Sequence, residues 1–378
     1  MNFLVLGAGA ISHAIVHDLL HSAGVENVFI CDIAEDKLET MEACDSERIH
    51  TMVFNANDIH TFETLLNGID CVISTLPVEH NYRLAKKTIT LGCHFIGMNG
   101  NIRILKKHMQ LHELAVDKGC CLIPDAGLAP GLTSIVSAEM LSRLDNATEL
   151  HILCGSLPLR RDNPLCHNKV YSVHTLLEQY IEQCLSLHDG QILYTPALAD
   201  VEAVHFPPSF PDLEAFPTSG GISAMPLTLK DHLQGISFKT LHYPGHHHMM
   251  KTLIELGFAD DTLVQLGGKS FSRRSLFETL LESSLAATFE DVVLFRALLK
   301  GNGRFLQAEL QKFYDIESGL SAFMICCGFP VSLLAQMCVK GEIGKSGYIY
   351  QERDIHPGEF LGRLAEKGIR FHFSSPQV

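Results

Sequence analysis

The sequence lacks the patterns that mark three common classes of protein. Its twelve cysteines include no Cys-x-x-Cys pair, no segment is of low complexity, and no run of Lys or Arg occurs in 378 residues. A disulfide framework is typical of much smaller secreted chains, so we interpret these cysteines as small buried side chains in a reducing compartment. A net charge of −14 with 19% charged residues argues against a nucleic-acid partner and against disorder.

We also expect neither a leader sequence nor a membrane anchor. Met1 is followed directly by the apolar segment FLVLGAG, without a basic n-region or a cleavage site. Residues 319–339 carry no charge and are long enough to span a bilayer, but Pro330 and several polar residues interrupt them. The pattern therefore predicts a buried helix, no membrane contact and a cytoplasmic location.

The first twenty residues predict a nucleotide-binding turn. An apolar run at residues 3–6 is followed by Gly7, Gly9 and Ser12 and then by an amphipathic pattern up to Leu20, as in a strand, a glycine-rich turn and a helix. Gly7 suits the tight turn, and Gly9 lets the backbone approach a pyrophosphate at the helix N-terminus. The small side chain of Ser12 still permits close packing of helix and strand.

A second predicted strand, NVFICDI, contains Asp32 near its end, about where a ribose diol needs a carboxylate. This acid would repel a 2′-phosphate and no Arg follows it directly, so the pattern favours NAD over NADP. The alternative is a structural glycine turn without a ligand, which the regular continuation of the chain disfavours.

The chain up to residue 124 alternates between strands and helices. Further strands are predicted at 49–54, 70–77, 93–100 and 120–124, and helices at 57–66, 79–91 and 102–118. Six alternating strands predict an α/β fold with a doubly wound parallel sheet of the Rossmann type. The expected cofactor contacts are Gly7, Gly9, Ala10, Ile11, Ser12, Asp32, Ile33, Asn57, Asp58, Thr75, Leu76, Pro77 and Asn99.

The stretch DAGLAPG at residues 125–131 follows the last of these strands. Ligands bind outside the carboxyl ends of the strands in open α/β sheets, so Asp125 is expected beside the nicotinamide. Gly127 and Gly131 permit backbone conformations closed to other residues, and the segment LTSIVSAEMLSRL then predicts a helix. A plain interdomain turn with a helix cap is the alternative.

Past residue 145 the pattern predicts an α+β domain with an antiparallel or mixed sheet. Its strands include ELHILCG, ISFKTLHY and DVVLFRALL, and its helices SVHTLLEQYIEQCL and HHMMKTLIELG. The tail at residues 319–350 predicts a long apolar helix that packs back on the first sheet. We therefore expect a NAD-binding Rossmann domain of residues 1–125 plus about 320–378, and an inserted substrate-binding and oligomerisation domain of residues 126–319.

No metal site is predicted. The adjacent histidines 246–248 point in different directions, and no Cys, Asp or Glu partner is spaced around them.

The sequence resembles the saccharopine dehydrogenase-like family over nearly its whole length, and most closely the lysine 6-dehydrogenase branch. The resemblance is carried by FLVLGAGAIS, IPDAGLAPGL, HNKVYSVHTLLEQY, PDLEAFPTSGG, KTLHYPGH and SLLAQMCVKGEIGKSG. It implies a two-domain subunit that forms a homodimer or larger homo-oligomer, with NAD(P) at the glycine loop and an amino-acid-derived amine or polyamine as substrate. After the fifth strand the sequence reads IGMNGN where that branch has an acid and Gly-Gly.

The implied reaction is oxidative deamination, in its most specific form of the ε-amine of L-lysine to the 6-semialdehyde. A base must take the ammonium proton, and Asp125 is the first candidate and His246 the second. A purely structural role is the alternative for each candidate. Substrate contacts are expected from Gly127, Arg160, Asn168, Tyr171, Glu214, Thr218, Ser219 and Gly220.

Two rival functions stay open. One is a saccharopine dehydrogenase or a carboxy(nor)spermidine synthase-type imine reductase. The other is a non-catalytic NAD-binding sensor or scaffold, which would need Gly7, Gly9 and Asp32 but not Asp125 or the PTSGG loop.

Overall fold

The computed structural model describes residues 1–42, 47–206, 210–285 and 289–375. The chain forms two compact units. Unit 1 comprises Met1–Arg143, Ile222–Met225 and Met324–Arg370, and unit 2 comprises Leu144–Gly221, Pro226–Phe323 and the described residues after Arg370. The two units therefore interleave in the sequence: Ile222–Met225 of unit 1 lies between two segments of unit 2, and the described residues after Arg370 return to unit 2.

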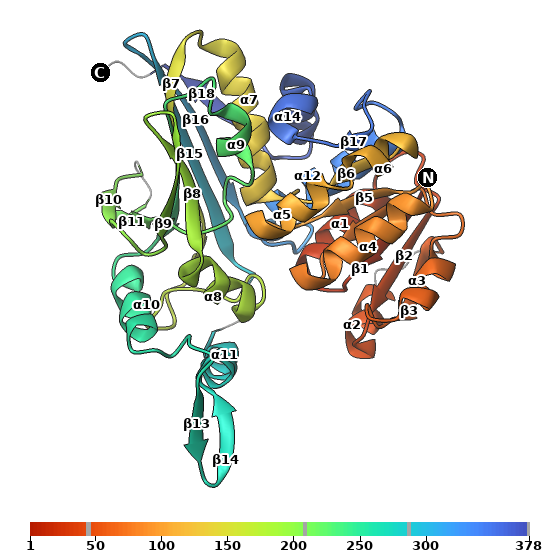
Figure 1. Ribbon diagram of the computed structural model, residues 1–378, viewed down its shortest axis with the longest axis horizontal. Helices are drawn as coiled ribbons and strands as arrows, with labels where there is room; N and C mark the ends of the chain where they lie inside the picture. The colour runs from red at the N-terminus through yellow and green to blue at the C-terminus, as the bar shows by residue number, and fades with distance from the viewer. Residues whose placement is uncertain (43–46, 207–209, 286–288, 376–378) are drawn as a thin grey trace. The chain divides into compact units, whose positions relative to one another are not determined.

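Unit 1 contains the predicted doubly wound parallel sheet, which is confirmed. Its strand order is β17-β6-β5-β4-β1-β2-β3, and the order reverses between β1 and β4 (Figure 1). This reversal places the glycine loop after β1 at the topological switch point. The strands are β1 (Asn2–Leu6), β2 (Asn27–Asp32), β3 (Ile49–Val53), β4 (Cys71–Ser74), β5 (His94–Gly97), β6 (Cys121–Ile123) and β17 (Gly347–Tyr348).

Helices cover both faces of this sheet. Apolar residues of α3, α4 and α6 pack with Leu4, Val72 and Phe95 from one face, whereas α12 packs on α1. The helices are α1 (Ala10–Leu20), α2 (Glu35–Glu42), α3 (Ile59–Leu65), α4 (Val78–Thr90), α5 (Ile102–Met109), α6 (His112–Asp117), α7 (Thr133–Arg143), α12 (Ala322–Val339), α13 (Gln351–Asp354) and α14 (Pro357–Glu366).

Two helix predictions in unit 1 are wrong in extent. The helix expected at 102–118 is two helices, because Gln110 and Leu111 donate to carbonyls only three residues back and end the α-helical pattern. The helix expected in the tail stops at Val339, since Gly341 and Gly344 follow with φ of 70° and 69°. The end of that tail instead adds a seventh strand, β17, beside β6.

Helix α12 is the apolar helix that the sequence predicts to be buried. By length and composition alone it could cross a membrane, but 89% of its 18-residue window is buried inside the structure. It approaches α1 closely at Gly328, where an added Cβ would lie 2.7 Å from the Cβ of Ala14 and 3.0 Å from the backbone nitrogen of Ile15. A glycine at this position therefore sets the spacing of the two helices.

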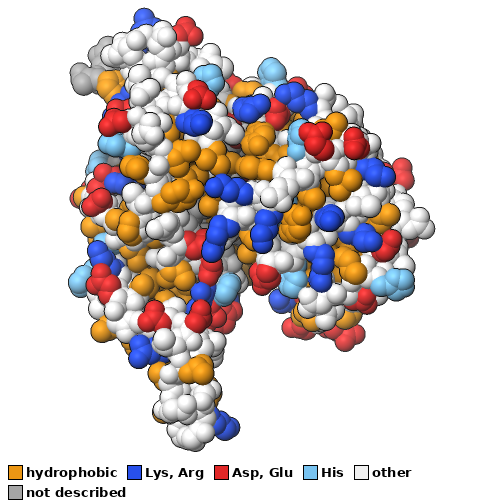
Figure 2. All heavy atoms as spheres, viewed as in Figure 1, with side chains coloured by type: hydrophobic (Ala, Val, Ile, Leu, Met, Phe, Trp, Pro, Cys, Tyr) orange, Lys and Arg blue, Asp and Glu red, His pale blue; other side chains and the backbone are white. Residues whose placement is uncertain are grey.

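Basic side chains gather over α4 and α5, although the whole chain carries a net charge of −14 (Figure 2). They come from Arg83, Lys86, Lys87, Arg103, Lys106 and Lys107.

Unit 2 is built on a mixed sheet, which confirms the α+β prediction. The main path is β10-β11-β12-β7-β15-β16-β18, with β7 and β12 parallel and the other neighbours antiparallel. Strands β8 and β9 branch from β12. The strands are β7 (Ala147–Pro158), β8 (Gln183–His188), β9 (Gln191–Pro196), β10 (Glu202–Val204), β11 (Leu213–Phe216), β12 (Gly235–His242), β15 (Asp291–Gly301), β16 (Arg304–Phe313) and β18 (His372–Ser374), with a separate hairpin of β13 (Leu263–Leu266) and β14 (Lys269–Ser272).

One helix of unit 2 is shorter than predicted. The segment SVHTLLEQYIEQCL was expected to be helical throughout, but α8 (Val173–Ile181) ends where Glu182 takes an extended conformation, and β8 begins at Gln183. Pairing of β8 with β9 outweighs the helical pattern of this short segment. The other helices are α9 (Met225–Leu229), α10 (His246–Glu255) and α11 (Arg273–Ser284).

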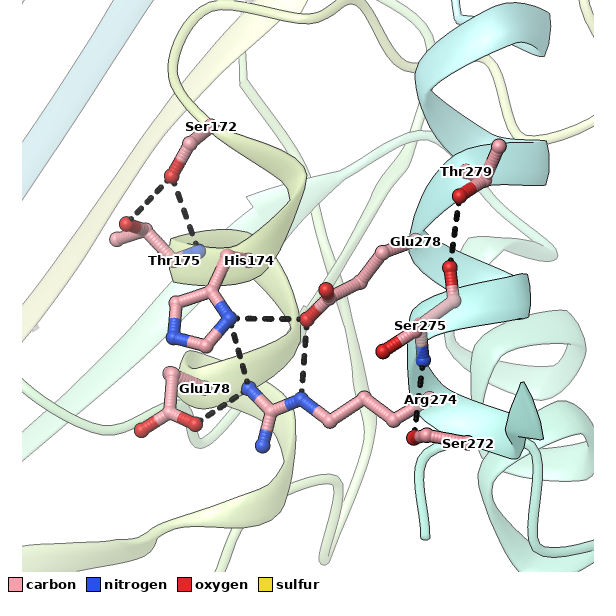
Figure 3. A network of polar contacts seen from close by, with 9 residues as sticks. All are labelled: Ser172, His174, Thr175, Glu178, Ser272, Arg274, Ser275, Glu278 and Thr279. Carbon is pink, nitrogen blue, oxygen red and sulfur yellow. Dashed lines mark hydrogen bonds and ion pairs between the residues drawn. The ribbon is translucent and has the colours of Figure 1, made fainter. Parts of the chain in front are cut away.

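An ion-pair network ties α8 to α11 (Figure 3). The guanidinium of Arg274 lies 2.5 Å from a carboxylate oxygen of Glu178 and 3.0 Å from one of Glu278, and His174 contacts the same oxygen of Glu278 at 2.9 Å. The Arg274 side chain is 11% exposed, so water screens this network less than a surface pair. The position of α8 is therefore fixed from one side.

Two glycine-to-alanine changes in helices should have opposite effects. Gly328→Ala would place a methyl group against the backbone of α1 and should lower the free energy of unfolding by about 1–3 kcal/mol. Gly362→Ala in α14, where an added Cβ meets no described heavy atom within 4 Å, should raise it by about 0.5–1 kcal/mol. Urea unfolding of both variants tests this, and equal effects would show that α12 and α1 do not approach closely.

Candidate functional site

The glycine loop after β1 is held by the end of β4. Gly7 has φ of 98°, and a Cβ there would lie 2.4 Å from Oγ1 of Thr75, so only glycine fits. The Thr75 hydroxyl donates to the carbonyl of Leu6 at 3.0 Å, which leaves its oxygen to accept from the hydroxyl of Ser12 at 2.9 Å. Ser12 is therefore more than a small packing residue, because its hydroxyl fastens α1 to β4.

The carboxylate of Asp32 closes this loop from the end of β2. One oxygen accepts from the backbone nitrogen of Ala8 at 2.7 Å and the other from that of Ala34 at 2.9 Å. Each oxygen keeps a further lone pair, so these bonds orient the carboxylate and still allow contact with a ribose hydroxyl. The neighbouring Ile33 is 68% exposed.

The residues at this edge fit a dinucleotide. A Cβ on Gly9 would meet no described heavy atom within 4 Å, which leaves room for a phosphate to approach the backbone. Helix α1 begins directly afterwards, at Ala10 and Ile11, with no cap from a described side chain. Further along the edge, the amide nitrogen Nδ2 of Asn99 is buried and has no hydrogen-bond partner among the described residues. An unpaired buried donor of this kind is suited to a ligand.

Four other predicted cofactor residues lie just before the helices that follow β3 and β4. Asp58 caps α3 and accepts from the backbone nitrogens of His60 and Thr61, while Asn57 accepts from Arg83 at 3.3 Å. Leu76 and Pro77 lie between β4 and α4, and Pro77 is the residue before the first turn of α4. The structure thus explains Asp58 as a helix cap, and its contact with a cofactor stays a prediction.

Asp125 lies at the carboxyl end of β6 and is 6% exposed. Its carboxylate accepts from the hydroxyl of Ser223 and from Nε2 of Gln351, which also donates to the Asp125 carbonyl at 2.9 Å. Ser223 has φ of 49°, a conformation that residues other than glycine rarely adopt. Three distant segments of unit 1 therefore converge on one carboxyl group.

Burial raises the pKa of Asp125 to about 7. The hydrogen bonds from Ser223 and Gln351 oppose this shift because they stabilise the carboxylate, and the negative charge of Glu352 adds to it. A carboxyl group with this pKa can both accept and release a proton near neutral pH, as a general base must.

The turn after Asp125 needs its glycines. Gly127 has φ of 135°, and a Cβ there would lie 3.2 Å from Cε of Met98 and 3.3 Å from the carbonyl oxygen of Pro130. Gly131 has φ of 120° and passes close to Ala126. The chain can thus turn sharply from β6 into α7 (Thr133–Arg143) and leave Asp125 at the sheet edge.

Within unit 2, His246 belongs to a buried aromatic cluster. Its Nδ1 donates to the carbonyl of Leu165 at 2.9 Å, so its Nε2 accepts from the Tyr180 hydroxyl at 2.8 Å. The ring stacks on that of His242 at 4.0 Å between centroids, and His167 lies 5.4 Å from both.

Burial keeps these histidines neutral. It lowers the pKa of His246 to about 4 and that of His167 to about 3, and it lowers the pKa of His242 well below its usual value. Because both nitrogens of His246 are already bonded and the ring resists protonation, Asp125 is the stronger candidate for the base.

Residue Gln179 of α8 joins two of the predicted substrate contacts. Its side-chain oxygen accepts from the Tyr171 hydroxyl at 2.8 Å, and its carbonyl accepts from the backbone nitrogen of Ser219 at 3.0 Å. Thr218 and Ser219 are buried, and Gly220 has φ of 91°. Asn168 is buried beside His167.

Two predicted substrate residues have evident structural partners. The Glu214 carboxylate accepts from the backbone nitrogens of Gly245 at 3.0 Å and His247 at 2.5 Å, so it caps the N-terminus of α10. The Arg160 guanidinium is 70% exposed and lies 3.1 Å from Asp162, while Arg161 stacks on Tyr243. Substrate contacts by Glu214 and Arg160 remain predictions.

Sequence reasoning missed Ser223, Gln351, Gln179 and Tyr180. Ser223 follows the PTSGG loop by two residues and could have been noticed for that reason. Gln351 and Tyr180 carry no local signal, because their partners Asp125 and His246 are distant in sequence. The same holds for the bond between the carbonyl of Gln179 and Ser219.

Comparison with known proteins finds two family models that match in succession. One is described as the saccharopine dehydrogenase NADP binding domain and matches residues 3–123, and the other as the saccharopine dehydrogenase C-terminal domain and matches residues 127–369. The solved apo structure of histidine-tagged saccharopine dehydrogenase (L-Glu forming) from Saccharomyces cerevisiae matches with a TM-score of 0.81 and 15% identity over all of both chains, which shows the same fold.

The chain matches only part of the length of its curated relatives. The alpha-aminoadipic semialdehyde synthase of Arabidopsis thaliana is 24% identical over 262 residues, which are 66% of this chain and 24% of that protein. The saccharopine dehydrogenase [NADP(+), L-glutamate-forming] of Pyricularia oryzae is 20% identical over 318 residues, 82% of this chain and 68% of that protein. The chain thus spans about a quarter of the length of the first of these relatives.

The buried carboxyl group of Asp125 should make stability depend on pH. The native state holds its proton up to about pH 7, whereas an unfolded aspartate loses it near about pH 4. The native state therefore binds more protons between these values, and the free energy of unfolding falls as pH rises through that window. Asp125→Asn removes this loss. The free energy of unfolding of the variant minus that of the wild type should therefore be higher at pH 8 than at pH 4, by up to about 4 kcal/mol.

Urea unfolding at pH 4 and pH 8 measures this difference. Asp261→Asn, at an exposed position, is the matched control and should not change the pH dependence. An Asp125→Asn protein whose stability followed pH as the wild type does would contradict the assigned burial of this group.

Proposed function

This chain belongs to the saccharopine dehydrogenase family, and on that premise we propose that it is a pyridine-nucleotide-dependent oxidoreductase acting on the C–N bond of an amino-acid-derived amine. The observation that carries the proposal is the environment of Asp125. This residue has a buried carboxyl group with a pKa of about 7 at the same sheet edge as the glycine loop.

The chemistry needs a base at this place. The nicotinamide of a bound cofactor would accept hydride from the carbon that bears the amine. An ammonium group cannot react in this way until it loses a proton, and Asp125 is partly ionised at neutral pH and can take it. Ser223 and Gln351 hold the carboxylate in place throughout, and water then hydrolyses the imine.

Two substrates are the leading candidates. L-Lysine, oxidised at its ε-amine to the 6-semialdehyde, requires one carboxylate site, for which Thr218, Ser219 and the amide of Gly220 are suited. Only three residues separate Ser219 from Ser223, the partner of Asp125, along the chain. Saccharopine is the second candidate, supported by the names of the relatives. It carries more carboxylates, whereas Arg160 and Arg161 already have partners in Asp162 and Tyr243.

We propose NAD as the cofactor, with NADP as the alternative that the description of the matched domain suggests. Asp32 lies at the end of β2, and Glu35 and Asp36 follow in the first turn of α2. Three acidic side chains in this region would disfavour an added 2′-phosphate.

The purified protein should reduce NAD⁺ with one member of a panel of L-lysine, L-ornithine, saccharopine, carboxyspermidine and diamines, with NADP⁺ assayed in parallel. Turnover of L-lysine with NAD⁺ would support the first candidate, and turnover of saccharopine alone the second. Asp125→Asn should bind the cofactor normally and lose about 100-fold or more in kcat/KM, because it cannot accept a proton. Cofactor binding without turnover across the panel would instead favour the sensor or scaffold.

Two neighbours of Asp125 should shift the acid limb of the pH–rate profile in opposite directions. Ser223→Ala removes a hydrogen bond to the carboxylate, raises its pKa and should move the limb of kcat/KM to higher pH. Glu352→Gln removes a negative charge, lowers that pKa and should move the limb to lower pH. Glu39→Gln makes the same charge change at an exposed position and should leave the limb in place. Coincident limbs in all the variants would exclude Asp125 as the base.

A further inference from the structure

Three side chains of types that bind metals meet near the amino-terminal ends of strands in the unit 1 sheet. His94 and Cys121 are the first residues of the neighbouring parallel strands β5 and β6, and Cys338 lies in the last turn of α12. One ligand atom from each lies within 4.8 Å of the other two. Asp125 and the glycine loop lie at the carboxyl ends of the strands, so this cluster is separate from the candidate active site.

The surroundings fix these groups in place. The backbone nitrogen of Cys121 donates to Nδ1 of His94 at 3.0 Å, and the Cys121 thiol donates to the carbonyl of Lys345 at 3.2 Å. Cys121 is 3% and Cys338 2% exposed. Cys71, the first residue of β4, pairs with His94 in β5. A further thiol therefore lies at the same end of the neighbouring strand.

We propose that His94, Cys121 and Cys338 bind one Zn²⁺ ion. The spacing is close to what zinc requires, since bonds of about 2.0–2.3 Å in a tetrahedron place ligand atoms roughly 3.4–3.8 Å apart. Small side-chain movements from the observed separations would suffice. Two sulfurs and an imidazole also select against Mg²⁺ and Ca²⁺, which prefer oxygen ligands.

Charge distinguishes zinc from the other thiophilic cation, Cu⁺. Zn²⁺ with two thiolates and a neutral imidazole is a neutral group, whereas Cu⁺ with the same ligands would carry a net negative charge. A buried site favours the neutral complex because an uncompensated charge there is costly.

Binding releases the protons that the two thiols hold. Zn²⁺ replaces the thiol hydrogens of Cys121 and Cys338, and the lone pair of His94 moves from the Cys121 backbone amide to the cation. The carbonyl of Lys345 then loses its thiol donor, so this oxygen or a water molecule can fill the fourth position. In the pH range where both thiols are protonated, two protons compete with each zinc ion. The affinity for zinc should therefore fall about a hundredfold for each unit by which the pH is lowered.

The test is a titration of the reduced, metal-free full-length protein with Zn²⁺ and, as a spectroscopic probe, Co²⁺. We expect one ion per chain, release of protons on zinc binding, and cobalt bands of a tetrahedral site with thiolate ligands. Cys121→Ser and Cys338→Ser should lose these bands. Cys184→Ser, which removes a buried thiol from unit 2, should keep them.

Several results would overturn the proposal. They are binding that survives both Cys121→Ser and Cys338→Ser, a cobalt spectrum without thiolate bands, and release of no protons. The last two readouts use the wild-type protein, so they decide the matter even if a serine variant does not fold.

Discussion

Burial of one carboxyl group organises the candidate active site. A carboxylate removed from water needs hydrogen-bond donors, and Asp125 finds them in the Ser223 hydroxyl and the Gln351 amide. These donors come from parts of the chain far from β6, so the site exists only when all three segments are in place. The glycines of the following turn and the left-handed backbone of Ser223 are the local cost of this arrangement.

The neutral histidines of unit 2 show how environment decides what a side chain can do. His246 begins a helix beside a glycine and looks accessible in the sequence. In the structure its ring is stacked and hydrogen-bonded at both nitrogens, and burial lowers its pKa. Glu214 similarly has the charge to meet an ammonium group, but the backbone amides of Gly245 and His247 already bind both of its oxygens. Residue type and position along the chain were insufficient to assign either role.

Sequence patterns predicted what local interactions determine. The glycine turn and the alternation of strands and helices both depend on residues a few positions apart, and the structure has them. The extent of α8 and of the tail helix was overestimated, because strand pairing of β8 and β17 is decided by partners far along the chain. The same reason hid Ser223, Gln351 and the meeting of His94, Cys121 and Cys338.

The connectivity of unit 1 limits how this protein can be divided. A fragment that stopped at Arg143 would contain the glycine loop and Asp125 but neither donor of the buried carboxyl group, and it would lack β17 and the helix that packs on α1. Such a fragment could not serve as an exchangeable module, in the laboratory or through recombination of genes. Both Ile222–Met225, which contains Ser223, and Met324–Arg370 would have to be supplied with it for this half of the molecule to regain its native contacts.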